Sequence, residues 1–172
     1  MFVPNLFFLG HVWFGLRHGA QPSEGGQDFS ETFRTSEGWR SLLEGSGRID
    51  SVGSGAFGPL DVTWASRTEE PGGRTSPEEL IAAAHASCFS MALSHALAES
   101  GHAPERLDVS ATVTLSLDDG PKVSSSHITV RGVVPGIDAD AFKQAAEGAK
   151  DGCPVSGALK GNLELTVDAE LA

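Results

Sequence analysis

The chain has 172 residues, of which 40% are hydrophobic, and its 12 basic and 23 acidic residues give a formal net charge of -11 at pH 7. The length suits one domain or one subunit of a compact oligomer. Because acids outnumber bases so strongly, the charge argues against a nucleic-acid binder and against a protein that docks on an anionic membrane surface. We interpret the charge mainly as a source of solubility.

The first thirty residues differ from the rest of the chain. Residues 1–16 are apolar but begin without Lys or Arg, whereas a secretory signal starts with a basic segment and ends at a small-residue cleavage site. The stretch is also too short and too interrupted to span a bilayer. We expect residues 1–30 to be an accessory extension, either disordered or the result of an upstream start codon. Residues 31–172 are expected to form the functional domain, and the protein is expected to be cytoplasmic. The alternative for the apolar N-terminal stretch is a signal peptide.

Five strands are predicted along the rest of the chain. Two short ones, 48–52 and 60–64, are separated by a glycine-rich turn. Three later segments, 107–117, 127–134 and 163–171, contain apolar residues that alternate with polar ones. A sheet with one apolar and one polar face is typical of half-solvated antiparallel strands.

Three helices are predicted, and the first has the clearest ends. Ser76 is expected at its N-cap, Glu79 completes a capping box, and Gly101 follows its last turn. This helix is apolar nearly all round and rich in alanine, which is typical of a helix buried on several sides. An amphipathic helix is expected at 138–150, and a short one from Cys153 to near Gly161.

The order of these elements predicts an α+β fold, with antiparallel sheets packed on the long central helix. The sheets alone would leave the alanine-rich helix under-covered, which favours a partner subunit.

The two cysteines lie 65 residues apart, which is not the pattern of a small disulfide-stapled domain. They are either two separate buried thiols or a redox pair. Cys153 precedes Pro154, a residue favoured at the first position of a helix, so we expect Cys153 at an N-cap. There the helix dipole and free N–H groups stabilise a thiolate. The alternative for Cys153 is a small buried cap residue.

Cys88 is predicted in the middle of the long helix, where burial raises the pKa of a thiol and makes it inert. A reactive Cys88 therefore needs a cation nearby. His85 is one candidate, because residues three apart share a helix face. Arg67 and Arg48 are better candidates, because a guanidinium stays charged when it is buried.

A buried arginine in turn needs a carboxylate. Glu78 precedes Cys88 by ten residues, which is about 15 Å along one helix axis. Either an arginine spans part of this distance, or a second subunit brings its own Glu78 to the site. We expect the second arrangement, in which packed helices also bury the alanines between Glu78 and Cys88. The alternative is that Glu78 only caps its own helix.

Three segments of the chain resemble the OsmC/Ohr family, and their residues are more similar to those of the OsmC branch. They are Ser76–Leu93 (SPEELIAAAHASCFSMAL), Val134–Asp138 (VPGID) and Gly152–Ser156 (GCPVS). The resemblance extends from about Trp39 to Ala172. It implies an intertwined homodimer with two sites at the subunit interface.

The resemblance also implies a function in oxidative or osmotic stress defence. The chain would be a thiol-dependent peroxidase that reduces organic hydroperoxides and is recycled by an external thiol or dithiol, with no bound cofactor or metal. By position, Cys88 is the peroxidatic cysteine, Cys153 the resolving cysteine and Glu78 the family glutamate. Arg67 suits the arginine position of the OsmC branch and Arg48 that of the Ohr branch, and we prefer Arg67.

The main rival function is a stress-induced protein without turnover that binds a ligand or a metal through His85, Cys88, Cys153 and acids. Zinc sites show recognisable spacings such as C-x-x-C, and none occurs here. A peroxiredoxin of the thioredoxin fold is disfavoured as well, because it needs alternating βαβ units. Phe89, Met91 and Phe142 suit a substrate pocket, although core packing is the simpler role for each.

Overall fold

The computed structural model describes residues 33–35, 46–50, 52 and 54–172. The described residues belong to two compact units, one made of residues 81–172 and one lying within residues 16–80. The fold is α+β, as predicted. The proposed extension at residues 1–30 lies outside the described residues.

The smaller unit contains an antiparallel sheet in the order β1-β2-β3. Strands β2 (Ser46–Ile49) and β3 (Leu60–Thr63) confirm that two short strands pair here, but β2 begins two residues before the predicted segment 48–52 and ends three residues before its end. Strand β1 (Phe33–Thr35) was not predicted, because three residues after a polar, glycine-rich stretch show no alternating pattern.

A one-turn helix, α1 (Ala65–Thr68), follows β3 directly. Arg67, which follows the predicted strand 60–64, lies on this helix. The turn is closed by reciprocal bonds: the Ser66 N–H donates to Thr63 Oγ1 at 3.0 Å, and the Thr63 N–H donates to Ser66 Oγ at 3.1 Å. Ser66 Oγ also contacts the carbonyl of Thr75, which ties α1 to the residues before the long helix.

The long helix, α2, spans Pro77–Glu99, in agreement with the prediction. The Glu79 N–H donates to Ser76 Oγ at 3.1 Å, which confirms the N-cap. The Glu79 carboxylate accepts from the Thr75 hydroxyl at 2.6 Å. At the other end Gly101 has φ +86°, and the next N–H reaches back to the carbonyl of Leu97 at 2.9 Å, so the predicted glycine stop is confirmed.

The larger unit contains a mixed sheet in the order β4-β5-β6. Strands β4 (Arg106–Ser116) and β5 (Lys122–Val133) are antiparallel, but β6 (Glu164–Leu171) runs parallel to β5. The expected antiparallel pairing is therefore wrong for this last pair. Helices α3 (Ala139–Gly152) and α4 (Pro154–Leu159) connect β5 to β6, and such a crossover returns the chain in the same direction.

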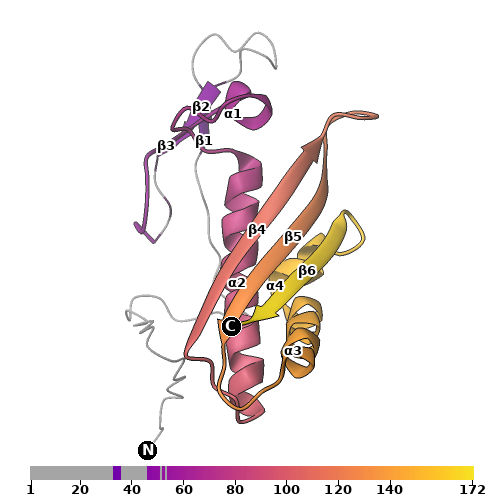
Figure 1. The fold of residues 1–172 in the computed structure, drawn as a ribbon. Coiled ribbons are helices and arrows are strands. Elements are labelled where there is room, and N and C mark those ends of the chain that lie inside the picture. The colour runs from indigo at the N-terminus through magenta and orange to yellow at the C-terminus, as the bar shows by residue number, and fades with distance from the viewer. Residues whose placement is uncertain (1–32, 36–45, 51, 53) are drawn as a thin grey trace, which may run out of the picture. The chain divides into compact units, whose positions relative to one another are not determined.

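The helices of this unit cover one face of the sheet (Figure 1). Alternate residues of β5 point into the core, where Ile128 and Val130 are fully buried. Phe89 and Phe142 are also fully buried there, so both serve in core packing, the simpler of their expected roles. The other large buried side chains of this cluster are Leu93 and Leu97.

Helix α2 is buried on one side only within a single chain. Its length and apolar composition would allow it to cross a bilayer, but such helices also form protein cores, and α2 packs into one here. His85, Phe89, Leu93 and Leu97 lie one turn apart and are fully buried. Other positions, among them Ala83, Ala84, Ser87 and Met91, are exposed. The expected burial on several sides is therefore not seen in the single chain, where α2 is buried on one face.

Candidate active site

The two cysteines lie together in the larger unit, as predicted. Cys153 links α3 to α4 and is 1% exposed, whereas Cys88 lies in the middle of α2 and is half-buried. Both are free thiols, and the two side chains interact closely enough for Cys153 to raise the pKa of Cys88. Two thiols in contact are placed for exchange chemistry between them.

The surroundings of Cys88 within the larger unit disfavour its thiolate. Burial raises the pKa of the Cys88 thiol, a backbone hydrogen bond from Val155 lowers it, and the neighbouring Cys153 raises it. The net result is a pKa above the ordinary thiol value. A reactive Cys88 therefore still requires a cation, as the sequence argument held.

Cys153 occupies the N-cap of α4 and Pro154 its first turn, which confirms the predicted cap. The Cys153 side chain makes no cap hydrogen bond. The donor that α4 offers to sulfur is the N–H of Val155, and its acceptor is Cys88. The start of α4 was expected to stabilise a thiolate at Cys153. Its Val155 N–H stabilises the thiolate of Cys88 instead.

His85 does not supply the cation. Its ring is fully buried, with Nδ1 2.7 Å from Ser126 Oγ and Nε2 2.8 Å from Ser156 Oγ. Burial lowers the pKa of His85 below its ordinary value, so the ring is neutral at pH 7. The prediction that His85 could be the cation is therefore wrong. The three-residue spacing from Cys88 gave no information on Ser126 and Ser156, the partners that β5 and α4 supply.

Arg67 and Glu78 form an ion pair in the smaller unit. Arg67 Nη2 lies 2.6 Å from Glu78 Oε1, and Arg67 Nε lies 3.2 Å from both carboxylate oxygens. The side chains are 22% and 8% exposed, and the guanidinium also lies 5.2 Å from the ring centroid of Trp64. Glu78 therefore does more than cap its helix: it fixes the arginine of its own chain.

The protonation of Glu78 is set by two opposing effects. Burial alone would raise the pKa of its carboxyl, but hydrogen bonds from Arg67 and from the backbone, with the charge of Arg67, outweigh burial. The pKa of Glu78 is lowered as a result. The pair is charged on both sides at neutral pH.

Arg48 has different surroundings. Its Nε donates to Asp61 Oδ1 at 2.9 Å across β2 and β3, and both side chains are more than half exposed. The carboxylate partner of Arg48 is thus a surface residue, whereas that of Arg67 is buried. This difference favours Arg67 as the functional arginine.

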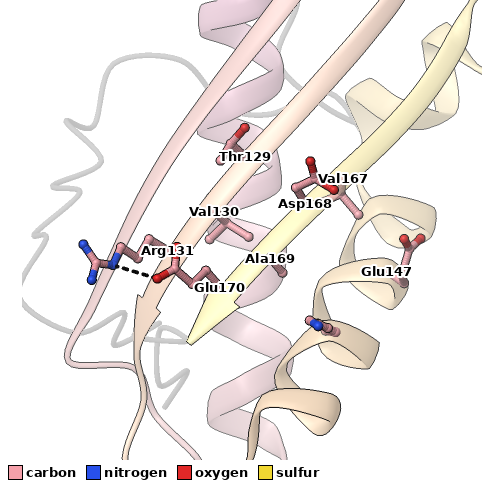
Figure 2. Close-up of a pocket in the computed structure, with 9 residues that line it drawn as sticks. Thr129, Val130, Arg131, Glu147, Val167, Asp168, Ala169 and Glu170 are labelled. Carbon is pink, nitrogen blue, oxygen red and sulfur yellow. Dashed lines mark ion pairs between the residues drawn. The ribbon is translucent and has the colours of Figure 1, made fainter. Parts of the chain in front are cut away.

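Hollows lined by described residues of the larger unit include two of different character. One, of about 490 Å³, is bordered by β5, β6 and α3, and charged side chains surround it, including the ion pair of Arg131 with Glu170 (Figure 2). The other, of about 620 Å³, lies between α2 and α3 and is lined mainly by small apolar residues. Its lining begins at Ala92, one turn after Cys88, and includes Gly152, which precedes Cys153. Met91, for which core packing was the simpler expected role and a pocket the other, is exposed in the single chain and lines neither hollow.

Among the described residues no group of three His, Cys, Asp or Glu side chains is placed to hold a metal ion. The metal-binding alternative therefore has no support in this part of the chain.

Four contacts of these groups were not predicted from the sequence. The stacking of Arg67 on Trp64 was signalled only by their three-residue spacing. Ser126 and Ser156 carry no local sign of a role, because they meet His85 across 41 and 71 residues of chain. The Val155 N–H is a backbone group, and only the preceding Pro154 hinted at a helix start there.

The fold and the paired thiols define the class of the protein, an α+β protein with a two-cysteine thiol site. The family model described as OsmC-like protein matches residues 70–168. The chain belongs to the OsmC-like family, which confirms the resemblance noted in the sequence.

Two curated relatives and one solved structure illustrate this membership. Peroxiredoxin OsmC of Escherichia coli K12 is 43% identical over 131 residues, which cover 76% of this chain and 89% of the relative. Organic hydroperoxide resistance protein-like 1 of Staphylococcus epidermidis is 35% identical over 104 residues, 58% of this chain and 72% of the relative. The organic hydroperoxide resistance protein OhrB of Bacillus subtilis shares the fold, with a TM-score of 0.61, 23% identity, and coverage of 84% of this chain and 98% of that one.

Proposed function

We propose that this protein is a cysteine-based peroxidase that reduces organic hydroperoxides to alcohols in stress defence. The observation that carries the proposal is the contact between the Cys88 and Cys153 thiols in a chain 43% identical to a named peroxiredoxin. The relatives named for organic hydroperoxide resistance indicate the substrate class. The apolar hollow between α2 and α3 suits the organic part of such a substrate.

The proposed reaction has three steps. The Cys88 thiolate attacks the terminal oxygen of the hydroperoxide, the O–O bond breaks, and the alkoxide leaves as the alcohol after it gains a proton. Cys88 is then a sulfenic acid. The Cys153 thiol attacks its sulfur, the S–O bond breaks, and water leaves as the disulfide forms. An external thiol or dithiol reduces the disulfide and restores both thiols.

Arg67 supplies the cation that Cys88 lacks in this proposal. A guanidinium beside the sulfur stabilises the thiolate and the negative charge that develops on the leaving oxygen. Glu78 holds the guanidinium by three contacts, so the position and orientation of the guanidinium are set before the substrate binds.

We further propose that the protein is a homodimer whose sites each combine two chains. Glu78 and Cys88 are separated by about 15 Å of rise along α2. Since Arg67 is held by Glu78 of its own chain, Arg67 and Glu78 would enter a partner's site together. The expectation that a partner's Glu78 holds Arg67 is therefore wrong, because Arg67 pairs with Glu78 of its own chain.

The exposed face of α2 supports this dimer. Ala83, Ala84 and Ser87 are small and exposed, and Met91 is 44% exposed in the lone chain. Small side chains allow two helices to pack closely, and such packing buries the apolar face left open here. Residues 1–30 have no part in the proposed site, and the protein is expected to act in the cytoplasm.

The direct test is the consumption of cumene hydroperoxide by the purified full chain with dithiothreitol as reductant. The wild-type chain should turn over and the Cys88→Ser chain should not. Turnover by neither chain, with both folded and a range of dithiols supplied, would exclude the peroxidase function and leave the ligand-binding alternative.

A further inference from the structure

A polar cluster lies inside the apolar core of the larger unit. The His85 ring is fully buried and contacts two serine hydroxyls, Ser126 on β5 at 2.7 Å and Ser156 on α4 at 2.8 Å. Both serines are buried as well. The rest of this core is aliphatic and aromatic, so a histidine with two serines needs a reason beyond packing.

The position of this cluster relative to the cysteines supplies that reason. His85 lies three residues before Cys88 on α2, and Ser156 lies three residues after Cys153 at the start of α4. Residues three apart share a helix face. The bond between His85 and Ser156 therefore joins the faces of the two helices that carry the two sulfur atoms.

We infer that His85 is a positioning residue, which holds the first turn of α4 against α2 so that Cys153 stays within reach of Cys88 while the disulfide forms. The inference rests on the proposed function. The disulfide step requires the Cys153 thiol to reach the sulfenic sulfur of Cys88, with its S–O bond broken and water released. Helix α4 has only six residues, and the first turn that the bond fixes also contains the Val155 N–H donor to Cys88.

The neutral state of His85 agrees with this role. A neutral imidazole has one N–H donor and one acceptor nitrogen, and a hydroxyl can serve either. Both serines can thus be satisfied at once, and burial, which lowers the pKa of His85, favours the neutral form. The ring therefore links two elements: Nδ1 bonds Ser126 on β5, and Nε2 bonds Ser156 on α4.

Ser156→Ala and Ser126→Ala form a matched pair of variants. Each removes one hydroxyl and leaves one ring nitrogen of His85 without its partner, so their costs in stability should be similar. Only Ser156→Ala releases α4. In a reaction with one equivalent of cumene hydroperoxide, we expect disulfide formation to slow about tenfold in Ser156→Ala, the effect of losing one buried hydrogen bond. The rate should change less than about threefold in Ser126→Ala.

The readout is intact mass over time, with dimedone added to trap the sulfenic acid of Cys88. Ser156→Ala should accumulate the dimedone adduct of Cys88, and its rate of disulfide formation should fall by a larger factor than its rate of initial peroxide consumption. A second pair covers the case in which a serine variant fails to fold. His85→Gln places an amide near the Nε2 position and should retain fast disulfide formation, while His85→Asn, whose amide is nearer Nδ1, should not.

Equal partition between sulfenic acid and disulfide in Ser156→Ala and Ser126→Ala would overturn the inference, as would equal rates in His85→Gln and His85→Asn. The proposed function would stand in that case, because the wild-type chain would still form the disulfide. A wild-type chain that forms no sulfenic acid at Cys88 would instead overturn the proposed function itself.

Discussion

Arg67 and Glu78 of one chain are joined through two nitrogens on one edge of the guanidinium: Nη2 lies 2.6 Å and Nε 3.2 Å from the same carboxylate oxygen. This pair exists without any contribution from a second chain. Arginine and carboxylate therefore behave as one preformed group, which the proposed mechanism directs at the Cys88 thiol. The consequences of that pairing can be measured separately for thiol reactivity, subunit sharing and stability.

The first prediction concerns the reactivity of Cys88. Because the larger unit alone raises the pKa of Cys88, Arg67→Ala should leave the thiol protonated at neutral pH. In a Cys153→Ser background, the rate of alkylation by iodoacetamide at pH 7 should fall about tenfold or more, and the pH of half-maximal rate should rise. Arg67→Lys keeps the charge but not the two-point geometry and should show a smaller change. An unchanged pH profile in Arg67→Ala would show that another cation serves Cys88.

The second prediction concerns sharing between chains. Arg67→Ala and Cys88→Ser homodimers should both be inactive. After the two chains are mixed and exchanged, each heterodimer should contain one site with an intact Cys88 from one chain and an intact Arg67–Glu78 pair from the other. About half the wild-type activity per heterodimer is expected, measured as hydroperoxide consumption. If heterodimers form, as native mass spectrometry can show, yet remain inactive, the site belongs to a single chain.

The third prediction concerns acid stability. The folded-state pKa of Glu78 lies below its ordinary value of 4.5, so the unfolded chain takes up the proton first as pH falls. The stabilisation by the pair is complete above about pH 4.5 and is lost as pH falls toward the folded-state pKa. Glu78→Gln should lower the free energy of unfolding by about 2 kcal/mol at neutral pH, and the difference should shrink below about pH 4. Urea titrations at both pH values check this. A difference that is constant with pH would mean that the Glu78 carboxylate is not stabilised by Arg67.

The fourth prediction concerns the core of the larger unit. A methyl group at Gly132 would lie 2.5 Å from Phe142 Cζ, closer than such atoms approach, and 3.2 Å from Leu107 Cδ2, which is an unusually tight contact. Gly132→Ala should therefore cost about 1–3 kcal/mol through overpacking against the fully buried Phe142. Gly148→Ala, on α3, meets nothing within 4 Å and should be neutral or slightly stabilising, which makes it the matched control. Equal melting temperatures for the two variants would contradict the packing seen here.

Much of the fold was predictable because its signals are local. Ser76 and Gly101 mark the ends of α2 through the chemistry of their own positions, and the structure uses both. The direction of β6 was not predictable in this way. Alternating apolar and polar residues suit a parallel or an antiparallel neighbour equally. The crossover through α3 and α4 brings the chain back in the same direction, so β6 runs parallel to β5.

The candidate site shows the same division. The contact of Cys88 with Cys153 followed from two recognisable motifs. The role of His85 did not follow, because its spacing from Cys88 suggested a cation while its two serine partners come from distant elements. The charge state of a buried side chain depends on all the groups around it, and only the folded chain brings these groups together.

The most direct test of the proposed chemistry is mass spectrometry of three full-length chains after one equivalent of cumene hydroperoxide. The wild-type chain should lose two hydrogens as the Cys88–Cys153 disulfide forms. Cys153→Ser should gain one oxygen at Cys88 and stall there, or over-oxidise at Cys88 when further hydroperoxide is supplied, and Cys88→Ser should remain unchanged. Oxidation of Cys153 in the Cys88→Ser chain at the wild-type rate would contradict the assignment of Cys88 as the attacking thiolate.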